Sequence, residues 1–297
     1  MSLIIAESLD QALAAMAEGA QPIAGGSDLV VGARQGKAPL PASLVAIDRL
    51  SELTGVVDTD GGLRIGAAVT HAMLLADPRV TADYTAIADA AALVGSPATR
   101  NVGTLGGNVM NASPAMDTGA PLVVLDATIE LFKSTGSREL GLHDLWLGPG
   151  QTSAAPDELC VAVSLPARPP GSGSAYVRLE YRRAMEIAVV GAAASVILNE
   201  DGTIADARVA LTAVAPTIIE VEGLDLSDQT PENAGNAAAA AASAAASPIS
   251  DLRASEGYRS HTIGVMARRA VEAASRRAAG EMIAVPVNRA FGVGAPQ

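Results

Sequence analysis

The hydrophobic pattern of the first half of the chain mixes short helices with short strands. Leu9, Leu13 and Met16 recur at helical spacing after Ser8, which can cap the helix. Asp60-Gly61 is a hairpin signal between two strand-like runs. The pattern predicts strands at 22–24, 44–47, 55–57, 63–67 and 128–132, a helix beginning near Asp28, a short helix capped by Thr70, and further helices at 79–93 and 117–125.

The second half has a simpler pattern. Runs at 176–183, 187–198 and 205–214 predict an antiparallel meander, followed by helices at 232–246 and 255–279. A sheet followed by helices makes this half α+β. The Pro- and Gly-rich stretch from Pro166 to Ser174 is the clearest linker. We therefore predict one domain at 1–168, with lobes at about 1–55 and 56–168, and a second at 175–285.

Composition narrows the class of protein. The chain has 297 residues, a length that suits about two domains, and only 2% of them are aromatic. The net charge of −12 argues against nucleic acid and anionic membranes as partners. One cysteine, Cys160, allows no disulfide and no zinc or iron–sulfur cluster, and we interpret it as a buried hydrophobe. The N-terminus has no basic region and the longest apolar run, 187–198, is too short to cross a bilayer, so we expect a cytoplasmic protein without a membrane span.

A glycine-rich stretch carries the strongest chemical signal. Gly103, Gly106 and Gly107 lie within five positions, and we interpret them as a loop because each glycine costs a helix interior about 1 kcal/mol. Successive loop amides without side chains can form an anion-binding nest, and a phosphate or pyrophosphate is the natural ligand. The alternative is a tight turn between packed elements. A second Gly-rich loop, 22–29, favours one long, doubly negative ligand held between the two.

These two loops resemble a known family. AGGSD at 24–28 and TLGG at 104–107 are similar to the pyrophosphate loops of the FAD subunit of molybdenum hydroxylases. These subunits are the medium chains of the carbon monoxide dehydrogenase, nicotine dehydrogenase and xanthine dehydrogenase group. The resemblance runs from about residue 6 to 279. Its most specific parts are RNVGTLGGNVMNASPAMD, YRRAMEIAVVGAAASV and ASEGYRSHTIGVMARRA.

The resemblance implies a set of residues that bind FAD without a covalent bond. The two loops would hold the pyrophosphate through Ala24, Gly25, Gly26, Ser27, Asp28 and Leu29, and through Thr104, Leu105, Gly106, Gly107 and Asn108. Asp117 would accept hydrogen bonds from a sugar hydroxyl, or it caps a helix. Leu159 would lie against the isoalloxazine, or it belongs to the core. Arg178 would place positive charge near the flavin, or it is a solvated strand residue.

Other polar residues receive structural interpretations. Arg182 and Arg183 precede Glu186, which stands where the family usually has Asp, and we interpret this segment as structure between domains rather than catalysis. The three histidines, His71, His143 and His261, lack the spacing of metal ligands and are interpreted as surface or packing residues. We predict no catalytic residue and no metal ligand in this chain.

The resemblance also implies a fold and a role. The fold is α+β, a two-lobed FAD-binding domain of the vanillyl-alcohol oxidase (PCMH) type with a smaller C-terminal α+β domain. The chain would take electrons from a small subunit with two [2Fe–2S] clusters, beside a large molybdopterin subunit, in a dimer of heterotrimers, and pass them to an external acceptor. An exposed apolar docking surface is expected. The alternatives are a stand-alone FAD oxidase of the vanillyl-alcohol type and a non-redox nucleotide-binding assembly protein.

Overall fold

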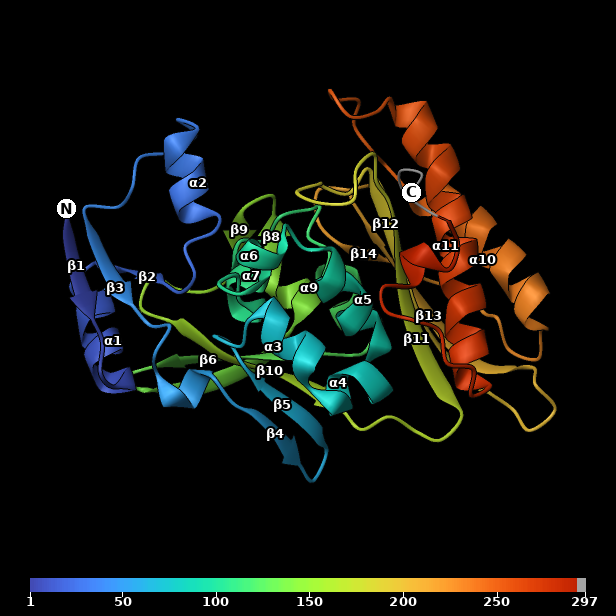
Figure 1. The fold of residues 1–297 in the computed structure, drawn as a ribbon, viewed down its shortest axis with the longest axis horizontal. Coiled ribbons are helices and arrows are strands. Elements are labelled where there is room, and N and C mark those ends of the chain that lie inside the picture. The colour runs from blue at the N-terminus through green and yellow to red at the C-terminus, as the bar shows by residue number, and fades with distance from the viewer. Residues whose placement is uncertain (293–297) are drawn as a thin grey trace. The chain divides into compact units, whose positions relative to one another are not determined.

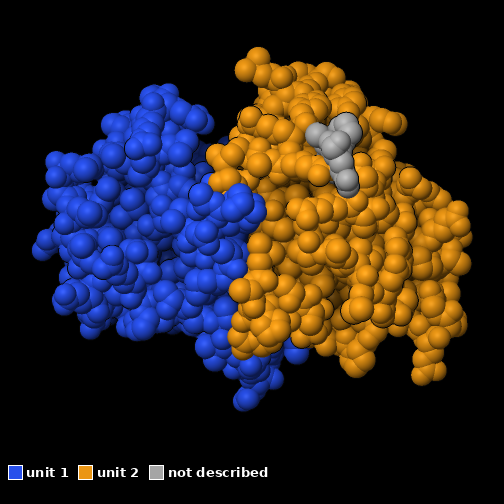
Figure 2. Space-filling model, in the orientation of Figure 1, with its two compact units in different colours: residues 1–73, 97–112, 127–167 blue, residues 74–96, 113–126, 168–297 orange. Residues whose placement is uncertain are grey.

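Segments far apart in the sequence pack together in the computed structural model, which describes residues 1–292. The packing forms two units (Figure 2): residues 1–73, 97–112 and 127–167 make unit 1, and residues 74–96, 113–126 and 168 onward make unit 2. Our prediction divides the chain linearly near residue 170. The packing instead assigns two internal segments to the C-terminal unit, because α5 (Thr85–Leu93) and α8 (Gly119–Val124) pack on its sheet.

Unit 1 contains two larger sheets and a small two-stranded one. The first is parallel with strand order β1-β3-β2, and the second is antiparallel with order β4-β5-β10-β6-β7. The sheet strands are β1 (Ser2–Ile5), β2 (Gln21–Ile23), β3 (Ser43–Ala46), β4 (Val56–Thr59), β5 (Gly62–Gly66), β6 (Thr128–Lys133), β7 (Gly136–Gly141) and β10 (Leu159–Pro166). The other elements are α1 (Leu9–Ala17), α2 (Leu29–Arg34), η1 (Ser51–Leu53), α6 (Pro97–Arg100), α7 (Leu105–Met110), α9 (Leu142–Leu145), β8 (Trp146–Gly148) and β9 (Gln151–Thr152), and α3 (His71–Ala76) begins in this unit.

Unit 2 is built on one antiparallel sheet with order β11-β12-β13-β14. Its strands are β11 (Ser172–Leu179), β12 (Val190–Leu198), β13 (Ile204–Thr212) and β14 (Ile219–Glu220). Its helices are α4 (Pro78–Asp83), α5, α8, α10 (Pro231–Ala245), α11 (Glu256–Ala278) and η2 (Val287–Arg289). The predicted meander and its two following helices are therefore present, with α10 and α11 side by side in Figure 1.

The core of unit 2 is made of small side chains at close range. Ala175, Val177 and Ala192 pack with the inner face of α11 in one cluster. A Cβ on Gly173 would lie 2.3 Å from the carbonyl oxygen of Ala274, and one on Gly264 would lie 2.8 Å from that of Ala239. A chain with few aromatic residues thus fills its core by bringing backbones together rather than by inserting rings.

Two local predictions were wrong. The pattern at 79–93 gave one helix, but the chain breaks at Tyr84, whose φ of −118° ends α4 and starts α5. The glycines at 106 and 107 were assigned to a loop, but they lie in the first turns of α7. Packing overrides propensity there, because a Cβ on Gly106 would lie 2.5 Å from the Cβ of Ala67. Cys160 is buried as expected, and burial, aided by Glu130, raises the pKa of its thiol to about 12.

A buried carboxylate joins four elements of unit 2. Asp89 on α5 accepts hydrogen bonds from the amides of Tyr176 (3.1 Å) and Val287 (2.9 Å). It also accepts from both terminal nitrogens of Arg277 on α11, at 2.6 and 3.0 Å. Its side chain is fully buried, so every one of these bonds is shielded from water.

Replacing Asp89 with Ala should lower the free energy of unfolding by about 3–5 kcal/mol, because Arg277 is left buried without its carboxylate. The urea concentration at the midpoint of unfolding measures this change, provided that the unfolding free energy depends on urea with the same slope in the variant and the parent. Asp206→Ala, at an exposed position of the same unit, is the matched control and should change the midpoint little. Equal midpoints for the two variants would contradict the assignment.

Candidate functional site

The first glycine loop connects β2 to α2 in unit 1. None of its amides from Gly25 to Leu29 donates a hydrogen bond to another group of residues 1–292. The carbonyls of Gly26 and Asp28, in contrast, are hydrogen-bonded: they accept from the amides of Val30 and Gly32 at 3.0 and 2.7 Å. Gly26 has a φ of +64°, a conformation that favours glycine. The loop therefore presents consecutive free amides, the donor set of an anion nest.

The second loop is held more tightly. Thr104 caps α7, and its Oγ1 accepts from the amide of Gly107 at 3.1 Å. The amides of Leu105 and Gly106 donate to the carbonyls of Val69 and Ala67, both at 2.9 Å. The amide of Asn108 donates to the carbonyl of Thr104. The amides of 105–108 thus already have acceptors within the protein, so in this structure the row of free donors belongs to the first loop.

The two loops are in direct contact. A Cβ built on Gly25 would lie 1.7 Å from the carbonyl oxygen of Val102, which leaves no room for any side chain at that position. A Cβ on Gly103 would lie 3.4 Å from Oγ of Ser27. Segments about eighty residues apart in sequence thus meet glycine to backbone, as a ligand shared between them requires. The resemblance named both loops, and their contact is visible only in the structure.

The far end of α7 is anchored by the single tryptophan of the chain. Trp146 is buried, and its indole Nε1 donates to the carbonyl of Val109 at 3.0 Å. An indole N–H needs a partner when it is buried, and here that partner is the last full turn of the helix that follows the second loop. The helix is therefore fixed at both ends, by Thr104 and by Trp146.

Sequence reasoning gave His71 no role, yet it lies next to the loop contact. His71 is 1% exposed, and its amide donates to the carbonyl of Gly103 at 3.0 Å. Burial, together with the positive charge of Arg100, holds the pKa of His71 at about 4. His143 and His261 are exposed, as expected of surface residues. A sequence signal for His71 was absent, because its position depends on a bridge between Thr70 and Thr104.

Asp117 and Arg178, both in unit 2, form one buried cluster. Nη1 of Arg178 donates to Asp117 at 2.7 Å, and Nε of Arg178 donates to Glu180 at 2.8 Å. The hydroxyl of Tyr176 donates to the other oxygen of Asp117 at 2.9 Å. Arg178 is 0% exposed, so it is not a solvated strand residue. Asp117 does not occupy the N-cap position of α8 either, because that position belongs to Thr118.

Burial and charge act against each other in this cluster. Burial lowers the pKa of Arg178, but Asp117, Tyr176 and Glu180 outweigh it and raise the pKa above its usual value. Burial raises the pKa of Glu180, and Arg178 only partly offsets that shift. Burial and the nearby Asp117 raise the pKa of Tyr176, which therefore stays a neutral donor. One guanidinium holds two carboxylates in place.

The remaining predicted residues are structural in their surroundings. Leu159 begins β10, is 3% exposed and belongs to the core of unit 1 with Val45 and Val161. Glu186 lies 3.6 Å from Nε of the exposed Arg182, a loose ion pair of the kind that contributes little. No group of three or more His, Cys, Asp or Glu side chains in the described part of the chain could hold a metal ion.

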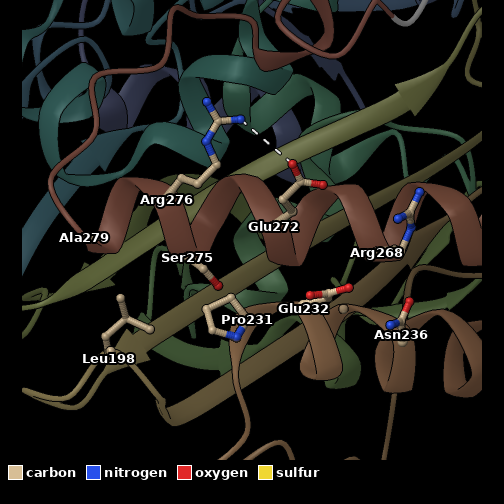
Figure 3. A pocket seen from close by; sticks show the side chains of 11 residues that line it. Leu198, Pro231, Glu232, Asn236, Arg268, Glu272, Ser275, Arg276 and Ala279 are labelled. Carbon is tan, nitrogen blue, oxygen red and sulfur yellow. Dashed lines mark ion pairs between the residues drawn. The ribbon is translucent and has the colours of Figure 1, made fainter.

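A cavity in unit 2 is lined by none of the predicted residues. Figure 3 shows it between α10 and α11, with a volume of about 330 Å³. The hydroxyl of Ser275 points toward Pro231, and Arg276 lies 3.9 Å from Glu272, its ion-pair partner. The exposed lining is mainly apolar and lies where the two helices pack, so the cavity has the character of a helix-packing groove.

Comparison with known proteins identifies the family. The family model described as the FAD binding domain in molybdopterin dehydrogenase matches residues 1–168, and that of the CO dehydrogenase flavoprotein C-terminal domain matches residues 175–274. The chain belongs to the molybdopterin dehydrogenase FAD-binding family. It is a FAD-binding medium subunit of the molybdopterin hydroxylases, a class of oxidoreductases, as the sequence resemblance predicted.

Individual relatives agree with this assignment. A putative xanthine dehydrogenase FAD-binding subunit of Escherichia coli K12 is 33% identical over 80% of this chain and 83% of its own length. The carbon monoxide dehydrogenase medium chain of Afipia carboxidovorans is 32% identical over 90% of this chain and 92% of its own. In the carbon monoxide dehydrogenase structure from Hydrogenophaga pseudoflava, a chain 31% identical superposes with a TM-score of 0.88, covering 93% of this chain and 98% of that one. The predicted α+β fold of this medium subunit is confirmed.

The medium subunit offers no helix suited to cross a bilayer: within residues 1–292, none combines the necessary length and hydrophobicity.

Replacing Arg178 with Met should destabilise unit 2 by about 3–5 kcal/mol, because Asp117 and Glu180 are left buried without their cation. Burial already raises the pKa of Glu180, and without the cation that partly offsets this shift its folded-state pKa rises further above the unfolded value. The variant should therefore regain stability as the pH falls from 7 to 5, and its deficit relative to the parent should narrow. Urea unfolding at both pH values measures this, with Arg268→Met, at an exposed position on α11, as the control. A deficit that is independent of pH would contradict the cluster.

Proposed function

We propose that this medium subunit carries non-covalent FAD and serves as an electron-transfer subunit. It takes electrons from the [2Fe–2S] clusters of a small subunit and passes them to an external acceptor. The substrate is oxidised at the molybdopterin of a large subunit. Support comes from relatives whose names describe them as FAD-binding subunits of xanthine dehydrogenase and medium chains of carbon monoxide dehydrogenase.

The observation that carries the proposal is the row of free amides beside the loop contact. Gly25 to Leu29 offer consecutive unbonded N–H groups, and Ser27 adds a hydroxyl close to Gly103. A diphosphate has two negative charges that several such donors can share. The absence of a Cβ at Gly25 and Gly103 lets the backbone of both loops approach such a ligand.

The other predicted residues keep the roles that the family implies. Thr104 to Asn108 close the second side of the diphosphate. Asp117 accepts a hydrogen bond from a sugar hydroxyl. Its two oxygens already accept from Tyr176 and Arg178, so one of them must accept a second bond. Leu159 would contact the isoalloxazine from its core position in β10, and the positive charge of Arg178 would act on the flavin from a cluster that also holds the carboxylates of Asp117 and Glu180. FAD supplies the redox chemistry when it is bound, and the residues of this chain bind and orient it.

An exposed apolar patch of unit 2 fits a docking role. Tyr181, Met185 and Ile187 are exposed on the loop between β11 and β12, and Ile249, Leu252 and Tyr258 are exposed around the start of α11. The hydroxyl of Tyr181 donates to the carbonyl of Arg253 at 2.7 Å and joins the two segments. Exposed apolar groups in such a patch favour a protein partner. We assign the patch to subunit contacts in a dimer of heterotrimers with one large and one small subunit.

Gly25→Ala should lower the affinity for FAD by about tenfold or more, equivalent to about 1.4 kcal/mol, because the new methyl group displaces the Val102 carbonyl and separates the loops. Gly32→Ala is the matched control, since a Cβ there meets nothing within 4 Å. Titration with FAD followed by flavin fluorescence measures both. A yellow protein with flavin bands excludes the non-redox assembly protein, and equal affinities of both variants would argue against diphosphate binding at the loops.

Leu252→Asp should reduce co-purification with the large and small subunits, because it places a charge at the most exposed apolar side chain of the patch. Met282→Asp is the control, since Met282 is 99% exposed but lies outside the patch. Affinity purification from co-expressing cells, followed by native mass spectrometry, measures the complex. If the parent and both variants are recovered with FAD bound but without partner subunits, a stand-alone oxidase is favoured instead.

A further inference from the structure

His71 is built into the contact between the two loops. Its amide is bonded to the carbonyl of Gly103, and its ring edge at Cδ2 lies 3.4 Å from the position that a Cβ of Gly103 would occupy. The same position lies 3.4 Å from Oγ of Ser27. The imidazole is therefore packed against the junction where the free amides of the first loop meet the second loop.

The ring has an unused polar atom. Nδ1 of His71 is buried, and no group among residues 1–292 forms a hydrogen bond with it. Nδ1 and Cδ2 lie on opposite edges of the ring, so the nitrogen on the side of the loop contact is Nε2, which is bonded to Cδ2 and also makes no hydrogen bond within the described residues. Buried polar atoms in proteins nearly always have a partner, so an imidazole with neither nitrogen bonded points to a missing one. The other two histidines are exposed and need no such explanation.

The charge that acts on His71 in the protein without ligand is positive and disfavours a protonated ring. Arg100, at the end of α6, is the charged residue whose field acts on the imidazole, and it favours the neutral ring. The first loop contributes one further titratable group, Asp28, whose pKa is raised by burial and partly lowered by Lys37. With a pKa of about 4, His71 is neutral at physiological pH in the protein without ligand.

We propose that His71 is a positioning residue for the FAD diphosphate: its imidazole hydrogen-bonds a phosphate oxygen and takes up a proton as the cofactor binds. The inference rests on the proposed function. Two phosphate charges beside the ring oppose the field of Arg100 and stabilise the imidazolium. The proton comes from solvent and stays on the ring, and no covalent bond changes.

The sign of the effect follows from linkage. Since the pKa of His71 is higher in the complex than in the free protein, FAD binding consumes protons between these two values. The affinity for FAD should therefore increase as the pH falls toward 6, by up to about tenfold per pH unit below the pKa of the complex. The diphosphate of FAD is fully ionised in this range and contributes no proton of its own.

The test is calorimetric titration of the full chain with FAD at pH 6 in two buffers of different ionisation enthalpy. If the isolated chain does not retain FAD, the same titration is carried out on the co-expressed complex after its flavin has been removed. We expect proton uptake by the parent and by Asp28→Asn, little uptake by His71→Asn with an affinity lower by about tenfold, and parental behaviour of His261→Asn. For the parent chain, NMR titration of the His71 ring with and without FAD gives the same answer without a variant.

Each outcome decides one point. Uptake that disappears in Asp28→Asn and persists in His71→Asn overturns the role of His71 and assigns the proton to Asp28. FAD binding without proton uptake, or an unchanged His71 titration, also overturns it while leaving the proposed function intact. Failure of both the chain and the complex to bind FAD overturns the proposed function itself.

Discussion

The candidate site depends on one steric constraint, the contact between Gly25 and the backbone at Val102. The distance leaves no space for a side chain, so the two loops can meet only if this position is glycine. The contact fixes the first loop in a conformation in which its amides find no partner in the protein. An isolated loop would satisfy those donors with water, whereas a loop held against a second segment keeps them aligned for one anion.

The second loop supplies rigidity rather than free donors. Its amides from Leu105 to Asn108 are bonded, Thr104 caps the helix that follows, and Gly106 lies against Ala67 so closely that only glycine fits. The glycines of the two loops thus serve different purposes. Gly25 permits the contact and exposes amides, and Gly106 lets a short helix pack down onto the strand-to-helix segment that precedes His71.

The sequence alone predicted the family, the α+β fold, the meander of unit 2 and the two loops. These features depend on local patterns: hairpin residues, helical periodicity and two glycine motifs. The division into units was out of reach, because it depends on α5 and α8 returning to a sheet that begins at Ser172. For the same reason the sequence carried no signal for the hydrogen bond between Arg178 and Asp117, which are 61 residues apart. The α7 helix was missed because packing against Ala67 outweighs the poor helix propensity of glycine.

The anchoring of α7 by Trp146 has a practical consequence. The chain has a single tryptophan, and its indole is bonded to Val109, three residues beyond Gly106. All indole emission from this protein therefore originates at one buried point within a turn of the second loop. Rearrangement of that loop can be followed through intrinsic emission in an unlabelled, unmutated chain, and the indole is also a built-in donor for resonance energy transfer to a yellow chromophore.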